Sequence, residues 1–167
     1  MFEPKPLSAE SIPDALEKAE QYRLLNEPRL AESICLDVLA VDPDNQEALR
    51  CIVLATADLL KRRRDAGVKQ AREYIARLKD EYRRAYYNGI VCERRGLVVL
   101  REAAHYYQHV AHGWFTTAME YYAEAEKLRP PGNDAVILRW NTVVRIFQTY
   151  PNLEPFPDDD HEPQMIE

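Results

Sequence analysis

Four side chains that can bind a metal ion lie close together in the sequence. These residues are Glu102, His105, His109 and His112. Their spacing of i, i+3, i+7 and i+10 would place them on one face of a helix. Two imidazoles one helical turn apart can chelate a divalent cation, and a Glu-x-x-His pair occurs in helical di-iron sites. Such a site needs a second Glu-x-x-His, which the chain lacks. Because ligands from one helix rarely complete a tetrahedral site, we expect neither a metal nor another cofactor.

The sequence has no motif for nucleophilic catalysis or for phosphate binding. Neither a Gly-x-Ser-x-Gly turn nor a glycine-rich phosphate loop occurs. The cysteines, Cys35, Cys51 and Cys92, are far apart in the sequence and lie within helical patterns, as is typical of buried free thiols in a reducing compartment. A cysteine that meets a histidine in space remains an open alternative. We expect a cytoplasmic protein without enzymatic activity.

Positive charge is densest in the run Lys61, Arg62, Arg63 and Arg64, named the basic patch here. Such a patch can bind nucleic acid or another polyanion, or it can be a solvated helix end. Acidic residues within 1–49, or Asp158–Asp160, can also neutralise it. The segment 151–167 holds six of the 28 acidic residues and no Lys or Arg, so the rest of the chain is neutral. This neutrality disfavours nucleic acid as the partner.

The elements that position these groups are indicated by a spacing signature that occurs three times. A small residue is followed by an apolar residue four positions later, by another after three more, and by a proline after five more. The copies are Ala31-Cys35-Val38-Pro43, Ala71-Ile75-Leu78-Arg83, in which arginine replaces the proline, and Ala118-Tyr122-Ala125-Pro130. This pattern predicts a helix that ends at the proline position.

The signature is similar to the second half of a tetratricopeptide repeat, and the stretch Ile12 to Asn45 resembles a complete repeat. The segments 83–96 (RRAYYNGIVCERRG) and 128–147 (LRPPGNDAVILRWNTVVRIF) also resemble a family of uncharacterised bacterial tetratricopeptide-like proteins. The resemblance implies helix pairs that stack and form a concave surface. It implies no activity.

We therefore predict an all-α, tetratricopeptide-like right-handed superhelix of about seven helices. Three helix-pair units cover 12–45, 46–80 and 81–131, and a capping helix covers 133–149. Residues 1–11 are expected to form a flexible N-terminus, and the acidic, proline-rich segment 151–167 a disordered tail. No apolar run approaches the roughly 18 residues of a membrane-spanning helix, so we expect no membrane association.

An insertion delays the second helix of the third unit. Residues 97–112 have their own helical stripe, formed by Leu97, Leu100, Ala104, Tyr107 and Ala111. Two outcomes are open: the insertion is a separate helix, or the preceding helix continues through Gly96, the only breaker. In either case the segment offers a surface for self-assembly.

The organisation favours a non-catalytic protein-interaction scaffold whose partner is an unidentified protein or peptide. We expect the first helix of each unit to line a groove for an extended or acidic peptide, with Arg50, Tyr86, Tyr87 and Arg94 as contacts. The alternatives are a homo-oligomer built through residues 97–112 and weak polyanion binding through the basic patch. The acidic residues Asp158–Asp160 are a further candidate ligand for the basic middle of the chain.

Overall fold

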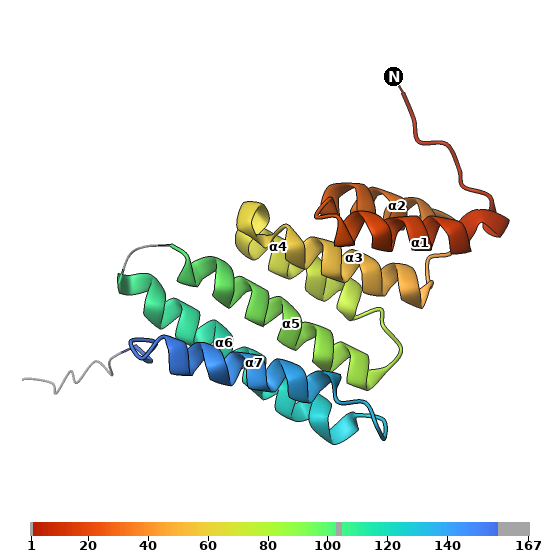
Figure 1. Cartoon of the computed structure of the whole chain (residues 1–167). Helices are drawn as coiled ribbons and strands as arrows, with labels where there is room; N and C mark the ends of the chain where they lie inside the picture. Colours follow the sequence, from red (N-terminus) through yellow and green to blue (C-terminus); the bar gives the residue numbers. More distant parts are fainter. Residues whose placement is uncertain (1, 103–104, 157–167) are drawn as a thin grey trace, which may run out of the picture.

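The computed structural model describes residues 2–102 and 105–156, except the side chains of residues 105 and 106. This part of the chain contains seven α-helices, one short 3-10 helix and no strand, which confirms the all-α prediction (Figure 1). The elements are η1 (Ala9–Ser11), α1 (Ile12–Leu24), α2 (Pro28–Val41), α3 (Gln46–Asp58), α4 (Leu60–Ile75), α5 (Glu81–Leu100), α6 (His105–Leu128) and α7 (Ala135–Thr149). None of these helices combines the length and the apolar character that crossing a bilayer requires.

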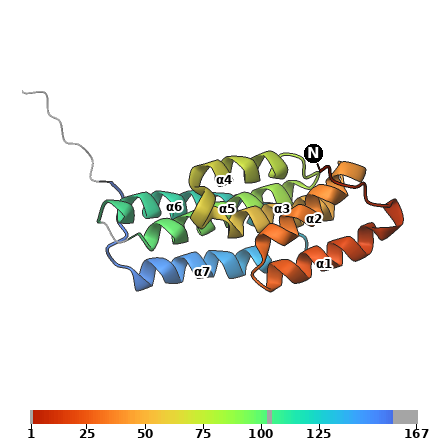
Figure 2. The same cartoon turned by 90° about the horizontal axis from the view of Figure 1, so that it is seen from above.

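The helices are arranged in two layers. Each odd-numbered helix packs against the next odd-numbered helix. It also packs against the even-numbered helix that lies between the two in the sequence. Among the described residues, α4 makes no comparable contact with α2 or α6. Figure 2 shows α1 and α7 on the same side of the molecule, with α3 and α5 set back between them, so the odd-numbered layer is curved.

Local sequence explains where several helices begin and end. Asn26 adopts a positive φ of 62° directly after α1, and Pro28 then occupies the first turn of α2. Asn45 accepts a hydrogen bond from the backbone N–H of Ala48 at 2.9 Å and so caps α3. Ser11, by contrast, makes no cap for α1, because its hydroxyl donates to the backbone oxygen of Ser8 at 2.8 Å.

The spacing signature marks residues of the core. All nine of its apolar positions are at most 2% exposed. They lie in α2, in α4 and the turn after it, and in α6, and are Ala31, Cys35, Val38, Ala71, Ile75, Leu78, Ala118, Tyr122 and Ala125. The pattern therefore identifies the helix face that packs inward in each copy, including the copy that ends in arginine.

The insertion lengthens two helices and forms no helix of its own. α5 continues through Gly96 to Leu100, as one of the two alternatives predicted, and α6 begins at His105. The stripe of the insertion is divided between them, with Ala111 fully buried in α6; Ala104 lies outside the described residues. The result is a long antiparallel hairpin, which makes the most extensive helix–helix contact of the fold (Figure 1).

Two glycines of α5 allow this hairpin to pack closely. A Cβ atom at Gly89 would lie 2.3 Å from the ring of Tyr122, and one at Gly96 would lie 2.8 Å from the ring of Phe115. Both rings are fully buried. Only hydrogen at these two Cα positions leaves room for the aromatic side chains of α6.

Of the segment predicted to be disordered from residue 151, the structure describes the part up to Phe156, in which Leu153 alone is buried. Leu153 is only 7% exposed and joins the core. His109 of α6 lies with Nδ1 at 2.9 Å from the backbone oxygen of Glu154 and at 3.0 Å from that of Pro155. The rest of the predicted tail, including Asp158–Asp160, lies outside the described residues. At the other end, Leu7 packs against the core within the predicted N-terminus.

The close packing of α5 on α6 predicts opposite effects for two glycine substitutions. Gly89→Ala is expected to lower the free energy of unfolding by about 1–3 kcal/mol, because the buried ring of Tyr122 has no space to move away. Gly113→Ala, where an added Cβ meets nothing within 4 Å, should raise it by about 0.5–1 kcal/mol. Urea unfolding followed by circular dichroism measures both. Equal stability of the two variants would contradict this account of the hairpin.

Candidate functional site

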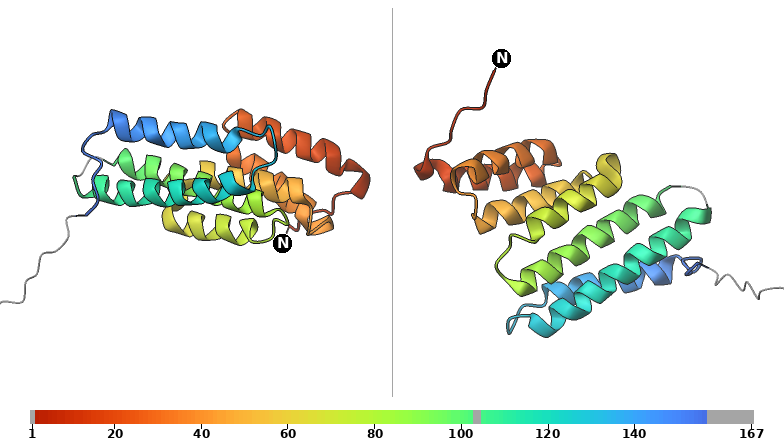
Figure 3. Two further views of the ribbon diagram at one scale, coloured as in Figure 1. Left: turned by 90° about the horizontal axis from the view of Figure 1, so that it is seen from below. Right: turned by 180° about the vertical axis from the view of Figure 1, so that it is seen from behind.

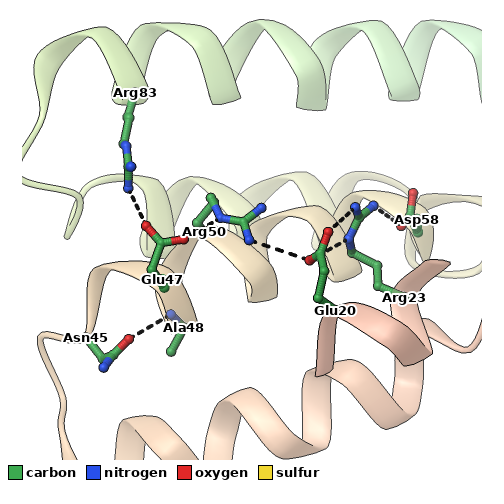
Figure 4. A network of polar contacts seen from close by, with 8 residues as sticks. All are labelled: Glu20, Arg23, Asn45, Glu47, Ala48, Arg50, Asp58 and Arg83. Atoms are coloured by element: carbon green, nitrogen blue, oxygen red, sulfur yellow. Dashed lines mark hydrogen bonds and ion pairs between the residues drawn. The ribbon is translucent and has the colours of Figure 1, made fainter. Parts of the chain in front are cut away.

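The exposed side of the odd-numbered layer, called the odd-helix face, carries a continuous chain of ion pairs. Seven side chains of α1, α3 and α5 alternate in charge; in order they are Arg83, Glu47, Arg50, Glu20, Arg23, Asp58 and Arg94. Successive N–O distances are 2.9, 2.7, 3.6, 2.8, 3.6 and 2.5 Å. Figure 4 shows all members except Arg94. We call this set the arginine–carboxylate chain.

The arginines of the arginine–carboxylate chain stabilise the ionised forms of two of its carboxylates. Hydrogen bonding by Arg23 lowers the pKa of Glu20 against the opposing effect of burial, and the positive charge of Arg50 lowers it further. Burial would raise the pKa of Glu47, but hydrogen bonds from Arg50 and Arg83 outweigh it and lower that pKa. Glu20 and Glu47 therefore stay ionised, and the ion pairs link the first helices of three successive pairs, α1, α3 and α5.

The four peptide contacts predicted from the sequence lie on α3 and α5, but they do not form one cluster. Arg50 and Arg94 both form ion pairs with carboxylates of the arginine–carboxylate chain. Tyr87 is 8% exposed beside Arg50, and burial raises its pKa. Tyr86 is half-buried and stacks on Tyr82 with a centroid distance of 5.6 Å. Sequence reasoning missed the acidic partners of these arginines, because Glu20 and Asp58 are 30 and 36 residues from Arg50 and Arg94.

The basic patch lies at a break in α4. Arg64 has φ 50° and ψ −130°, which interrupts the helix, and it contacts Glu102 at 3.5 Å. Arg63 forms a bidentate pair with Glu32 at 2.5 and 2.7 Å, so an acidic residue of the first unit does neutralise part of the patch. Lys61 and Arg62 line a small hollow that also contains acidic residues. The patch is therefore divided among several local contacts.

The described candidate metal ligands contact an arginine, an aromatic ring and the backbone after α7. Glu102 pairs with Arg64, and the ring of His112 meets Phe147 edge-on at a centroid distance of 5.5 Å. Burial lowers the pKa of His112, and His109 contacts the segment after α7. The side chain of His105 is outside the description. Within the described part of the chain, no group of three or more His, Cys, Asp or Glu residues is placed to hold a metal ion.

A buried polar group that sequence reasoning missed joins α5, α6 and α7. Glu93 is 2% exposed and accepts a hydrogen bond from the hydroxyl of Tyr122 at 2.5 Å. Its other oxygen lies 3.2 Å from a guanidinium nitrogen of Arg139. Burial and the charge of Glu93 raise the pKa of Tyr122, so the phenol stays protonated and donates. The position of Tyr122 in the signature was the one sequence signal for this site.

The cysteines are buried and free, as predicted. Cys35 of α2 and Cys51 of α3 are neighbours in space although they are far apart in sequence. A hydrogen bond between the two thiols raises the pKa of Cys35, and burial raises it further. The same hydrogen bond lowers the pKa of Cys51 against the opposing effect of burial. Arg72 contacts the sulfur of Cys92 at 3.8 Å. These contacts belong to the packing between layers.

Comparisons of the chain with protein-family models, with curated proteins and with solved structures find no match. The fold and the candidate site define the class as an all-α protein with a curved, charged face on one layer of helices.

The buried group predicts a stability effect that distinguishes two adjacent tyrosines. Tyr122→Phe is expected to lower the free energy of unfolding by about 1–3 kcal/mol, because the Glu93 carboxylate loses a buried donor. Tyr121→Phe, at the half-buried neighbouring position, should change it by less than about 0.5 kcal/mol. Chemical denaturation of the two variants provides the comparison. A Tyr122→Phe variant as stable as the parent protein would argue against this role of the hydroxyl.

The arginine–carboxylate chain predicts a dependence of stability on pH. Because the pKa of Glu20 is lower in the folded protein, its contribution is fully present above the unfolded value of about 4.3 and is lost as pH falls through the folded value. Glu20→Gln should therefore destabilise the protein at neutral pH, with a difference from the parent that shrinks below about pH 4.

Thermal unfolding at a series of pH values measures this difference. Glu17→Gln is the matched control, because Glu17 lies one turn earlier on α1, is exposed and has Gln21 as its hydrogen-bond partner at 3.4 Å. A difference between the parent and Glu20→Gln that is the same at pH 7 and at pH 3 would refute the argument.

Proposed function

We propose that this chain is a non-catalytic protein-interaction scaffold with a tetratricopeptide-like superhelix, which binds an extended acidic peptide on the odd-helix face. The observation that carries the proposal is the arginine–carboxylate chain, which begins and ends with arginine. It places four guanidinium groups against three carboxylates on that face. The excess of one positive charge favours a ligand of opposite sign.

Three observations support a tetratricopeptide-like arrangement. The odd-numbered helices contact one another in succession, each even-numbered helix fills the angle between two of them, and the signature positions are buried in every copy. Stacked helix pairs of this kind expose one curved layer of first helices. In this protein the layer consists of α1, α3, α5 and α7 (Figure 2).

The ends of the arginine–carboxylate chain are the places where a ligand can bind without displacing a partner. Arg83 and Arg94 have one carboxylate each within the chain, and their side chains are 37% and 33% exposed. A guanidinium group has five N–H donors, so each retains donors for a ligand carboxylate. Arg50, in the interior, lies between Glu47 and Glu20 and has fewer donors to offer.

The separation of the two terminal arginines sets the expected spacing of the ligand's charges. Arg83 and Arg94 lie on the same side of α5, eleven positions apart, which corresponds to about 16 Å along a helix axis. An extended peptide covers this distance in about five residues. Of the two tyrosines between the arginines, the half-buried Tyr86 offers aromatic surface to the peptide segment that joins the two acidic residues, whereas Tyr87 is buried.

Selection from a displayed library of random twelve-residue peptides tests the proposal. We expect enriched peptides to carry two acidic residues about four to six positions apart. In titrations of a selected, fluorescently labelled peptide, Arg83→Gln and Arg94→Gln should each weaken binding about tenfold, because each removes a charge-assisted contact.

Lys127→Gln on α6 is the control, because this residue lies in the last turn of an even-numbered helix. It should change the affinity less than about twofold. Selected peptides that lack the acidic pair, or that bind equally well to Arg83→Gln and to Lys127→Gln, would contradict the proposal.

A further inference from the structure

A groove runs between α4 and α6 on the opposite, even-numbered layer, and we call it the α4–α6 groove. It consists of two adjoining hollows of about 570 and 480 Å³, both lined by Arg72 and Trp114. Val68 of α4, Ala76 directly after α4, and Val110 of α6 add apolar surface. α4 and α6 do not pack against each other to any comparable extent within the described residues, so the space between them remains open.

The described chain ends in this groove. After α7 the backbone crosses from the odd-numbered layer to the side of α6 (Figures 2 and 3). Leu153 anchors the crossing in the core, and the backbone oxygens of Glu154 and Pro155 contact His109. Pro155 and Phe156 then form part of the wall of the first hollow. The described part of the chain therefore ends at the wall of the groove.

The groove has a charge that suits the residues that follow. Lys69 and Arg72 are exposed cations on its α4 side. Arg95 is 7% exposed, bonds Asp65 at the rim through Nε at 2.9 Å, and has no described hydrogen-bond partner at Nη1. Asp65 and Glu73 also line the groove, whereas Arg95 lies outside its lining. Because Asp65 is paired with Arg95, the two exposed cations Lys69 and Arg72 outnumber the remaining lining carboxylate, Glu73.

The sequence after Phe156 complements this lining. Residues 157–167 read PDDDHEPQMIE, with acidic residues first and the apolar pair Met165 and Ile166 near the end. Eleven residues reach about 36–40 Å when fully extended. The second hollow lies beyond Trp114, directly next to the first, so this length suffices to fill both.

We infer that residues 157–167 bind in the α4–α6 groove of their own chain. Asp158–Asp160 face Lys69 and Arg72, and Met165 and Ile166 cover the apolar surface around Trp114. Because the groove lies on the layer opposite the odd-helix face, this segment does not compete with the proposed peptide ligand. The inference is independent of the proposed function.

Fluorescence quenching of Trp114 tests the inference directly. Trp140→Phe leaves Trp114 as the only tryptophan, since the chain has two. We compare this protein with the same protein ended at Phe156, which retains every described helix. Removal of residues 157–167 should raise the acrylamide quenching constant about twofold, because the indole loses its cover. The Trp114→Phe protein, which retains Trp140 on α7, should show no change on the same truncation.

Charge variants of the full chain test the electrostatic part without truncation. Replacing Asp158, Asp159 and Asp160 by Asn should expose Trp114 to the quencher, and so should Lys69→Gln. Lys79→Gln, at an exposed position in the turn before α5, is the control and should leave quenching unchanged. Salt at about 1 M, where the Debye length is near 3 Å, should weaken the protection in the parent protein.

Two results would overturn the inference. One is a quenching constant for Trp114 that is the same in the full and the shortened chain. The other is protection that increases with protein concentration together with a dimer in light scattering, since this would assign the groove to the tail of a second copy. Protection that is independent of concentration and is lost on truncation supports binding within one chain.

Discussion

A carboxylate at the centre of the α5–α6 contact constrains the second half of the fold. Burying an ionised group costs several kcal/mol unless hydrogen bonds and an opposite charge compensate. Glu93 obtains both, from Tyr122 of α6 and from Arg139 of α7. The helices must therefore meet at fixed register, and Gly89 is required because the ring of Tyr122 occupies the space of its side chain. The same group that costs free energy when unpaired thus specifies how three helices fit together.

The odd-helix face is organised by charge in a different way. Its ion pairs are partly exposed, so each contributes little to stability alone. These ion pairs nevertheless form one continuous series of alternating charges across α1, α3 and α5, and each side chain is therefore held in a defined place. A surface with fixed guanidinium groups needs little rearrangement when a ligand binds, which reduces the entropic cost of association. The buried carboxylate therefore sets the helix register, whereas the arginine–carboxylate chain would present donors to the proposed ligand.

The sequence predicted the helices well and the side-chain partners poorly. The signature positions, the turn at Asn26 and the cap at Asn45 depend on residues within a few positions of each other, so local sequence encodes all three. The burial of Glu93 could not be predicted from the sequence, because an acidic residue followed by two arginines has the pattern of an exposed helix face. Its partners are 29 and 46 residues away, and no local pattern relates them. The break at Arg64 was also unpredicted, since no glycine or proline marks it.

The long α5–α6 hairpin has a consequence for the order in which the chain folds. Its two helices are consecutive and make the most extensive contact of the structure, so closing them requires only a short loop. Contacts that are local in sequence form early, because they demand little loss of chain entropy. We expect the hairpin to be the nucleus of folding, on which α7 and the first four helices assemble from opposite sides. The insertion that interrupts the repeat pattern would then be the segment that makes folding of the whole chain fast.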